Sequence, residues 1–245
     1  MCLILFAHKI HPDYPLILAG RDLVGGGTWL GITRTGRLAT VANFRHPSKL
    51  HQTGLSRGML TVDFLRSDVS PGAYLETVAQ QAERYKGFNL LIGDGAELAY
   101  YSNRERVINQ LSPGIYGLSN ALLDTPWPKV TQGKAALAEL LAADLLEPEA
   151  LLGVLADTSR PPDEQLPDTG IGSERERLLS SRFITSTDYG TRASTVILFD
   201  RTGQVTFVER SFGPSSSHWQ DVRYRFRLQQ QAVATAPGPP GSDNG

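Results

Sequence analysis

The chain opens with Met1-Cys2-Leu3-Ile4-Leu5-Phe6-Ala7, an apolar run with the length of a buried strand. Cys2 is the only cysteine in 245 residues. Removal of Met1 would give Cys2 a free α-amine, and an amine with a pKa near ~8 can accept the thiol proton at neutral pH. Cys2 is therefore a candidate nucleophile that carries its own base. The alternative, which is commoner for a lone cysteine, is a small buried residue at the start of a strand.

Further short runs bounded by turn residues predict more strands. Arg34-Thr35-Gly36, Asp94-Gly95-Ala96 and Arg201-Thr202-Gly203 each join two runs in the way of a β-hairpin, which indicates antiparallel pairing. The predicted strands cover residues 3–7, 16–19, 28–33, 37–43, 88–93, 97–101, 194–200, 204–210 and 222–228.

Apolar residues at helical spacing predict helices over residues 70–87 and 131–144 and from Pro148 onward, each able to cover a sheet face. Strands, then helices, then strands again predict an α+β fold. Residues 159–173 are rich in Pro, Asp and Gly and predict a long surface loop or lid. We expect residues 1–228 to form one domain and the Pro- and Gly-rich residues 229–245 to be a disordered tail.

The composition argues against several classes of partner. The net charge is -1 with basic and acidic residues interspersed, so we expect no nucleic-acid binding. No apolar run approaches the ~20 residues of a membrane helix, so we expect no membrane insertion. The first residues lack the features of a signal peptide, which favours a cytoplasmic protein. The five histidines show no metal-ligand spacing, and His8 and His11 are expected at a solvated hairpin tip.

Several phrases in a fixed order resemble the NRDE family, which is named for an Asn-Arg-Asp-Glu motif and includes transport and Golgi organisation proteins of animals. The resemblance extends from residue 1 to about residue 228. It is carried by Met1-Cys2-Leu3-Ile4, Leu16-Ile17-Leu18-Ala19, Gly26-Gly27-Thr28-Trp29-Leu30-Gly31, Gly87-Phe88-Asn89-Leu90, Tyr116-Gly117-Leu118-Ser119-Asn120-Ala121-Leu122, Gly190-Thr191-Arg192, Val205-Thr206-Phe207-Val208-Glu209-Arg210 and Ser217-His218-Trp219. The family is similar to N-terminal nucleophile hydrolases. The resemblance therefore implies an αββα sandwich, with two antiparallel sheets between helical layers.

The name-giving motif is missing from this chain, because Leu18-Ala19 joins directly to Gly20-Arg21-Asp22. Arg21 and Asp22 are candidate ligand-binding residues that could substitute for the lost Arg-Asp. Their spacing from Leu16 is one residue shorter than in the family, however, and such a shift in a strand turns side chains to the opposite face. We therefore do not expect them to restore the lost function.

Three further residues are candidates through the resemblance. Asn43 and Asn120 match positions where related hydrolases place amide donors for an oxyanion, although an Asn at a strand end is also a common turn former. Arg192 could orient the thiolate or bind a carboxylate or propionate, and a surface ion pair is the alternative.

Two functions remain open. The resemblance implies links to haem trafficking and to acyl-CoA or lipid handling, and the missing motif favours a carrier that reuses the hydrolase cleft. No cofactor is required in this hypothesis, and a Cys2 thiolate could ligate the iron of bound haem. The alternative is a cysteine amidohydrolase or thioesterase that uses Cys2, with Asn43 or Asn120 holding the oxyanion.

Overall fold

The computed structural model describes residues 2–22, 29–45, 54–213 and 218–229, and for residues 19–22 it describes the backbone alone. Within these residues, strands of the first sheet pair antiparallel in the order β11-β10-β9-β2-β1-β8. They are β1 (Leu3–His8), β2 (Leu16–Asp22), β8 (Gly114–Leu118), β9 (Ala193–Phe199), β10 (Gln204–Phe212) and β11 (Trp219–Arg227).

The second sheet is also antiparallel and has the order β3-β4-β5-β6-β7. Gly36, with φ of 87°, lies in the turn between the first two of these strands, a conformation that favours glycine. The strands are β3 (Leu30–Ile32), β4 (Leu38–Asn43), β5 (Phe88–Gly93), β6 (Leu98–Ser102) and β7 (Ile108–Gln110).

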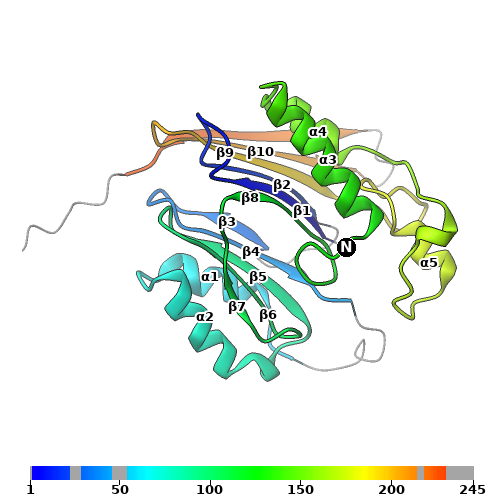
Figure 1. The fold of residues 1–245 in the computed structure, drawn as a ribbon, viewed down its shortest axis with the longest axis horizontal. Helices are drawn as coiled ribbons and strands as arrows, with labels where there is room; N and C mark the ends of the chain where they lie inside the picture. Colours follow the sequence, from blue (N-terminus) through cyan, green and yellow to red (C-terminus); the bar gives the residue numbers. More distant parts are fainter. Residues whose placement is uncertain (1, 23–28, 46–53, 214–217, 230–245) are drawn as a thin grey trace, which may run out of the picture.

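The two sheets pack face to face between helical layers, as Figure 1 shows. Their inner faces share one apolar cluster, to which the first sheet contributes Ile4 and Phe6 and the second contributes Leu91 and Tyr100. Helices α3 (Pro128–Ala142) and α4 (Pro148–Leu155) cover the outer face of the first sheet, and α1 (Gly58–Arg66) and α2 (Pro71–Gln80) cover that of the second. The predicted α+β sandwich of two antiparallel sheets is confirmed.

Local sequence explains how the helices begin and how closely they pack. Proline occupies the first helical position of α2, α3 and α4, where its missing N–H costs no hydrogen bond. Gly133 of α3 lies against Leu5, and a Cβ at position 133 would come within 2.8 Å of the Leu5 side chain. The helix can approach β1 this closely because Gly133 has no side chain.

Several expectations need correction. His8 and His11 are buried, at 6% and 7% exposure, and do not form a solvated tip. The His11 ring accepts hydrogen bonds from the backbone N–H groups of Asp13 and Tyr14, and burial lowers the pKa of His8.

The sequence pattern also missed α1, β7, β8 and the short helix α5 (Ser173–Leu178).

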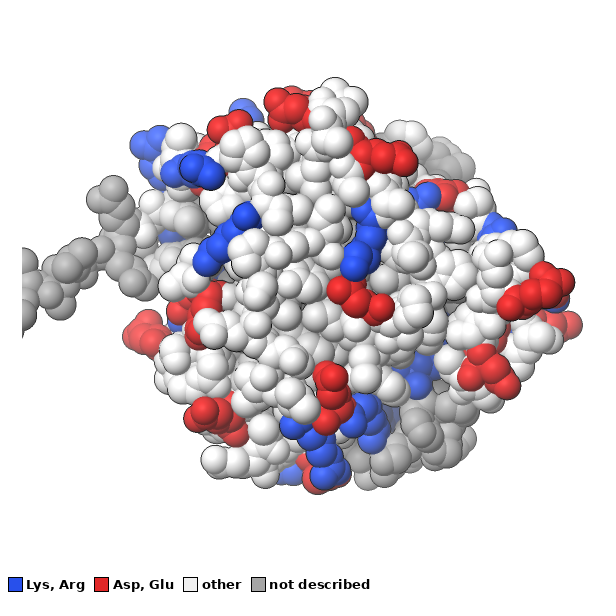
Figure 2. Space-filling view, in the orientation of Figure 1, with Lys and Arg blue, Asp and Glu red and all other residues white. Residues whose placement is uncertain are grey.

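Acidic and basic side chains are intermixed on the face shown in Figure 2, and neither sign dominates it. Within the described ranges, no helix combines the length and the apolar character needed to cross a membrane.

Candidate functional site

The predicted site residues converge on one end of the first sheet. Ile4 pairs with Leu118, so continuing this register by two residues places Cys2 beside Asn120 on the β8 side. Leu3 pairs with Arg21, which places Cys2 beside Asp22 on the β2 side.

The neighbouring strand β9 brings Arg192 to the same end of the sheet. Asp22 pairs with Ala193, the first residue of β9, and Arg192 precedes it directly. The backbone positions of Cys2, Asn120, Arg21, Asp22 and Arg192 therefore lie at the same sheet end, although they come from four separate parts of the chain.

Cys2 itself is buried, with 3% of its surface exposed. It belongs to the apolar cluster between the sheets, together with Ile4, Leu118 and Ala42. The Ser119 hydroxyl donates a hydrogen bond to the Cys2 carbonyl at 3.1 Å and so fixes the backbone at this position. In the chain that retains Met1, very little of the Cys2 surface is therefore open to a substrate.

Asn120 is 4% exposed and holds two strand ends together. Its side-chain Nδ2 donates to the Asn43 carbonyl at 2.8 Å, and its carbonyl accepts from the Arg45 N–H at 2.7 Å. Its Oδ1 is buried without a hydrogen-bond partner in the described part of the chain.

Asn43 lies at the end of β4, as predicted, with an exposed side chain. The structure thus joins Asn43 and Asn120, but through the main-chain carbonyl of Asn43 and not through two amide donors aimed at one point.

The candidate ligand-binding residues are less well defined. Arg192 is exposed, and its carbonyl accepts from the Phe212 N–H at 2.8 Å. Arg21 and Asp22 lie in β2, as their register with β9 shows, and their side chains are outside the described atoms.

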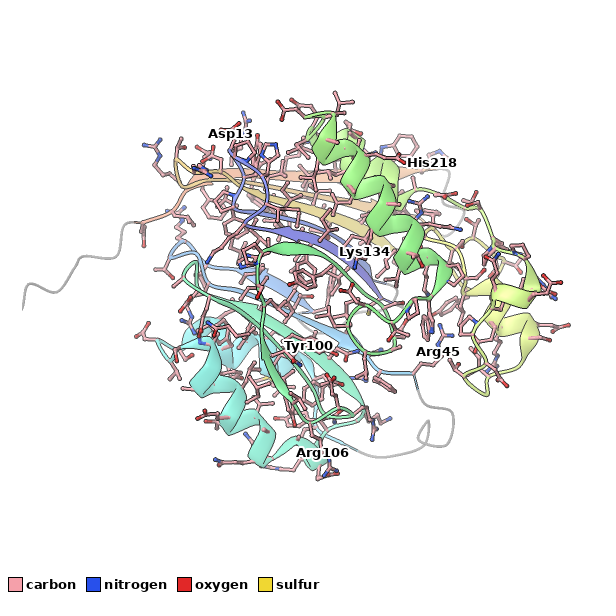
Figure 3. All side chains as sticks on the ribbon, viewed as in Figure 1. Asp13, Arg45, Tyr100, Arg106, Lys134 and His218 are labelled. Carbon is pink, nitrogen blue, oxygen red and sulfur yellow. The ribbon has the colours of Figure 1, made fainter. Side chains whose placement is uncertain are left out.

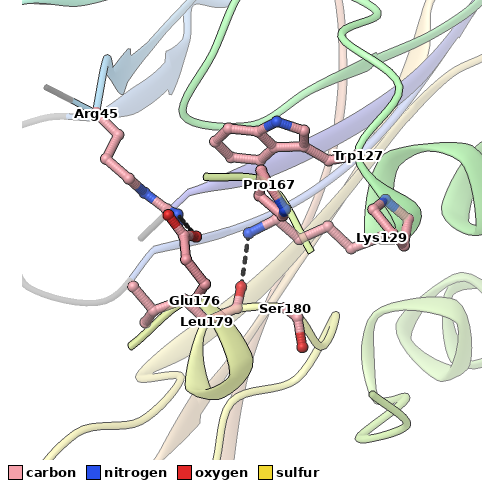
Figure 4. A pocket seen from close by; sticks show the side chains of 8 residues that line it. Arg45, Trp127, Lys129, Pro167, Glu176, Leu179 and Ser180 are labelled. Atoms are coloured by element: carbon pink, nitrogen blue, oxygen red, sulfur yellow. Dashed lines mark hydrogen bonds and ion pairs between the residues drawn. The ribbon is translucent and has the colours of Figure 1, made fainter. Parts of the chain in front are cut away.

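A buried ion pair next to Asn120 was not predicted. Arg45 Nη1 donates to Glu176 Oε2 at 2.6 Å, with 10% and 4% of the two side chains exposed (Figure 4). The guanidinium lies 4.8 Å from the centre of the Trp127 ring. Burial lowers the pKa of Arg45, and the neighbouring Glu176 opposes this shift. The cavity between these residues is about 10 Å³, which is room for no more than one water molecule.

The same contacts fasten the segment that carries α5 over this end of the sandwich. Glu176 also accepts from the Thr169 N–H at 2.9 Å, and Lys129 Nζ donates to the Leu179 carbonyl at 2.9 Å. The sequence-predicted loop at residues 159–173 is therefore held down in this structure. Nothing in the local sequence around Arg45 or Glu176 indicates that the two residues meet.

A second polar cluster links the two sheets near Asn120. Tyr100, labelled on the second sheet in Figure 3, belongs to the cluster between the sheets; its hydroxyl donates to Asn89 Oδ1 at 2.8 Å and accepts from the Leu123 N–H at 3.2 Å. Asn89 Nδ2 donates to the Ala121 carbonyl at 2.8 Å. Burial raises the pKa of Tyr100 to about 12, so the hydroxyl stays protonated as a donor. The phrase Gly87-Phe88-Asn89-Leu90 contains Asn89, but nothing in the sequence indicates that its side chain bonds to Tyr100.

Within the described residues, no three His, Cys, Asp or Glu side chains are grouped closely enough to hold a metal ion.

Comparison with known proteins decides the family. The family model described as Transport and Golgi organisation 2 matches residues 17–214. The chain belongs to the Transport and Golgi organisation 2 family. It is 41% identical over 231 residues to the Transport and Golgi organization protein 2 homolog of Bos taurus and 39% identical over 231 residues to that of Homo sapiens. In both comparisons the match covers 87% of this chain and 83% of the relative.

A more distant member of the Transport and Golgi organisation 2 family is also similar. Transport and Golgi organization protein 2 of Drosophila melanogaster is 25% identical over 223 residues, with 79% of this chain and 75% of the fly protein matched.

Proposed function

We propose that this member of the Transport and Golgi organisation 2 family is a cytoplasmic carrier of haem or of an acyl-CoA or related lipid. In this proposal the protein uses the frame of an N-terminal nucleophile hydrolase without cleaving its ligand. The observation that carries the proposal is the burial of Cys2, which is 3% exposed within an apolar cluster in the chain that retains Met1. Acyl transfer requires an accessible nucleophile and donors aimed at the developing oxyanion.

The amide donors support the same proposal. One hydrogen of Asn120 Nδ2 is used by the Asn43 carbonyl, and the Asn43 side chain is exposed. The second Nδ2 hydrogen of Asn120 is therefore the one side-chain amide donor left there among the described contacts, and a pair of amide donors aimed at one point beside Cys2 is not formed.

The missing motif is a further support. The 231 aligned positions exceed 87% of a 245-residue chain, so the bovine relative has residues at positions where this chain has none. The direct join of Leu18-Ala19 to Gly20-Arg21-Asp22 is where we place the loss.

A cysteine amidohydrolase or thioesterase is the second candidate, and the convergence of Cys2, Asn120 and Asp22 at one sheet end favours it. After Met1 removal, the α-amine would accept the thiol proton while the sulfur attacks the carbonyl carbon. The α-ammonium would return a proton to the leaving amine or thiol, and water would then hydrolyse the acyl-enzyme.

Titration of the purified protein with haemin and with palmitoyl-CoA, with free CoA measured in the same samples, tests the proposal. The state of the N-terminus is first read from the intact mass. A carrier gives saturable binding of at least one ligand, seen as a Soret shift or a calorimetric isotherm, with no CoA release above buffer. CoA release that Cys2→Ala abolishes would overturn the carrier proposal, and so would the absence of binding to both ligands.

A further inference from the structure

We infer that a pocket on the outer face of the first sheet, between α4 and the strands β9, β10 and β11, binds a small amphiphile with an apolar body and one carboxylate. The inference deepens the lipid option of the proposed function, with a fatty acid as the related lipid, and in that sense rests on it. The pocket itself does not involve Cys2 or the amides beside it.

The size of this pocket distinguishes it from the cavity at the Arg45 end. Its volume is about 380 Å³, against about 10 Å³ beside Arg45 and Glu176. Small-molecule sites commonly occupy about 300–1,000 Å³ and combine an apolar lining with a few polar groups. Of these two cavities, the larger one has room for a small molecule without rearrangement.

The lining on one side is apolar. Leu152 comes from α4 and Ala156 is the C-cap residue of that helix, and Phe183 and Phe212 pack edge to face with ring centres 4.8 Å apart. Trp219 completes this wall and leaves 58% of its surface exposed, which is a large exposed fraction for an aromatic residue lining a pocket. An apolar ligand body would cover this ring and gain from its removal from water.

The other side provides a fixed cation. Arg210 pairs with Ser194 in the strand register, and both line the pocket. Arg210 Nε and Nη2 each donate to Asp221 at 2.8 Å, and Nη2 also donates to Glu149 at 3.0 Å. Its Nη1 has no hydrogen bond to any described residue. The guanidinium is therefore held in place with donor capacity remaining, which suits a carboxylate.

The surrounding charges indicate how a carboxylate would be accommodated. Glu149 is 57% exposed and is also bound by Arg223 Nη2 at 2.6 Å. A ligand carboxylate can therefore replace Glu149 on Arg210 while Glu149 stays paired with Arg223. This exchange predicts that Glu149 competes with the ligand.

The pocket also borders two of the predicted ligand-binding positions. Ser194 pairs with Arg21 across β2 and β9, and the Phe212 N–H donates to the Arg192 carbonyl. Two of the three residues predicted to bind a ligand, Arg21 and Arg192, thus have backbones that neighbour residues lining this pocket.

Calorimetric titration with dodecanoate, and with dodecanol as the uncharged probe, tests the inference. We expect saturable binding of dodecanoate that is about tenfold or more tighter than binding of dodecanol, because the Arg210 contact is charge-assisted. Glu149→Gln should tighten dodecanoate binding about two- to fivefold, since it removes an exposed competing charge, and should leave dodecanol unchanged.

A matched pair of tryptophan substitutions locates the site. Ala156 and Ala143 are both exposed C-cap residues with nearly the same backbone angles, at the ends of α4 and α3. Ala156→Trp fills the pocket and should weaken dodecanoate binding by about tenfold or more, whereas Ala143→Trp should leave it unchanged. Equal affinities in both variants would overturn the inferred site, and so would a wild-type protein that does not bind dodecanoate.

The same pair separates failure of the site from failure of the carrier proposal. If haemin or palmitoyl-CoA binds and Ala156→Trp does not weaken that binding, the carrier proposal stands and this pocket is not the cargo site. If dodecanoate binding depends on Ala156 while neither haemin nor palmitoyl-CoA binds, the pocket stands and the proposed cargo is wrong.

Discussion

Arg45 and Glu176 lie 131 positions apart in the sequence, yet their side chains meet at 2.6 Å in a buried ion pair. The Arg45 N–H donates to the Asn120 carbonyl, so this pair is joined directly to the sheet end that contains Cys2. The contact holds the segment around α5 against that end.

Glu176→Gln tests the importance of this pair. The substitution replaces the carboxylate bound by Arg45 Nη1 with a neutral amide in a buried site, and we expect the free energy of unfolding to fall by about 3 kcal/mol, measured by urea denaturation. We also expect faster alkylation of Cys2, because the segment over this end is released.

The neighbouring pair of Arg177 and Asp163 is the control, because both side chains are well exposed. Asp163→Asn should leave the urea midpoint and the alkylation rate unchanged. An equal effect of the two substitutions would show that burial of the Arg45 pair is unimportant.

Asn120→Ala and Asn43→Ala should differ, although both positions were predicted as amide donors. Asn120→Ala removes a buried hydrogen bond to the Asn43 carbonyl and should lower the free energy of unfolding by about 1–2 kcal/mol. Asn43→Ala removes an exposed side chain and should change it by less than about 0.5 kcal/mol. Thermal or urea unfolding decides between this result and equal losses, which would contradict the described roles.

Tyr100→Phe should destabilise the protein by about 1–3 kcal/mol, because Asn89 Oδ1 and the Leu123 N–H both lose a buried partner. Tyr101→Phe is the matched control in the same strand, since the Tyr101 hydroxyl makes no hydrogen bond to another described residue. A difference smaller than about 0.5 kcal/mol between the two variants would argue against the polar link between the sheets.

The fall in the free energy of unfolding at acidic pH should depend on Asp221. Hydrogen bonds from Arg210, opposed by burial, lower the pKa of Asp221 to about 2, below its unfolded value near ~3.9. The unfolded state therefore binds a proton first as the pH falls, so the contribution of Asp221 is complete above pH ~4 and is lost toward pH ~2. Asp221→Asn should flatten the stability profile in that window. An unchanged profile would mean that the carboxylate contributes nothing through its arginines.

Much of the fold follows from local sequence. Hairpin turns such as Arg34-Thr35-Gly36 and Arg201-Thr202-Gly203 lie where predicted, because turn chemistry acts over a few residues. Strand β8 was missed, although its residues belong to a recognised phrase, because Gly114 and Gly117 weaken a strand pattern. His11 was wrongly predicted to be exposed, because the local sequence does not show that the backbone N–H groups of Asp13 and Tyr14 donate to its ring.

Some residues of the candidate site could be predicted from the sequence and others could not. Position two and the resemblance gave Cys2 and Asn120, and the strand register places them side by side. Arg45, Glu176 and Tyr100 were missed because their contacts depend on how distant elements pack. The pocket under α4 was missed for the same reason, since Ala156, Arg210 and Trp219 come from separate elements.

The most direct test of the carrier account is the intact mass of the protein, freed of Met1, after it is mixed with palmitoyl-CoA and quenched in acid. The account predicts an unmodified mass, no CoA release above buffer, and retained palmitoyl-CoA binding in the Cys2→Ala variant. A palmitoyl adduct on Cys2, accompanied by CoA release that Cys2→Ala abolishes, would contradict it and assign the protein to the cysteine hydrolases.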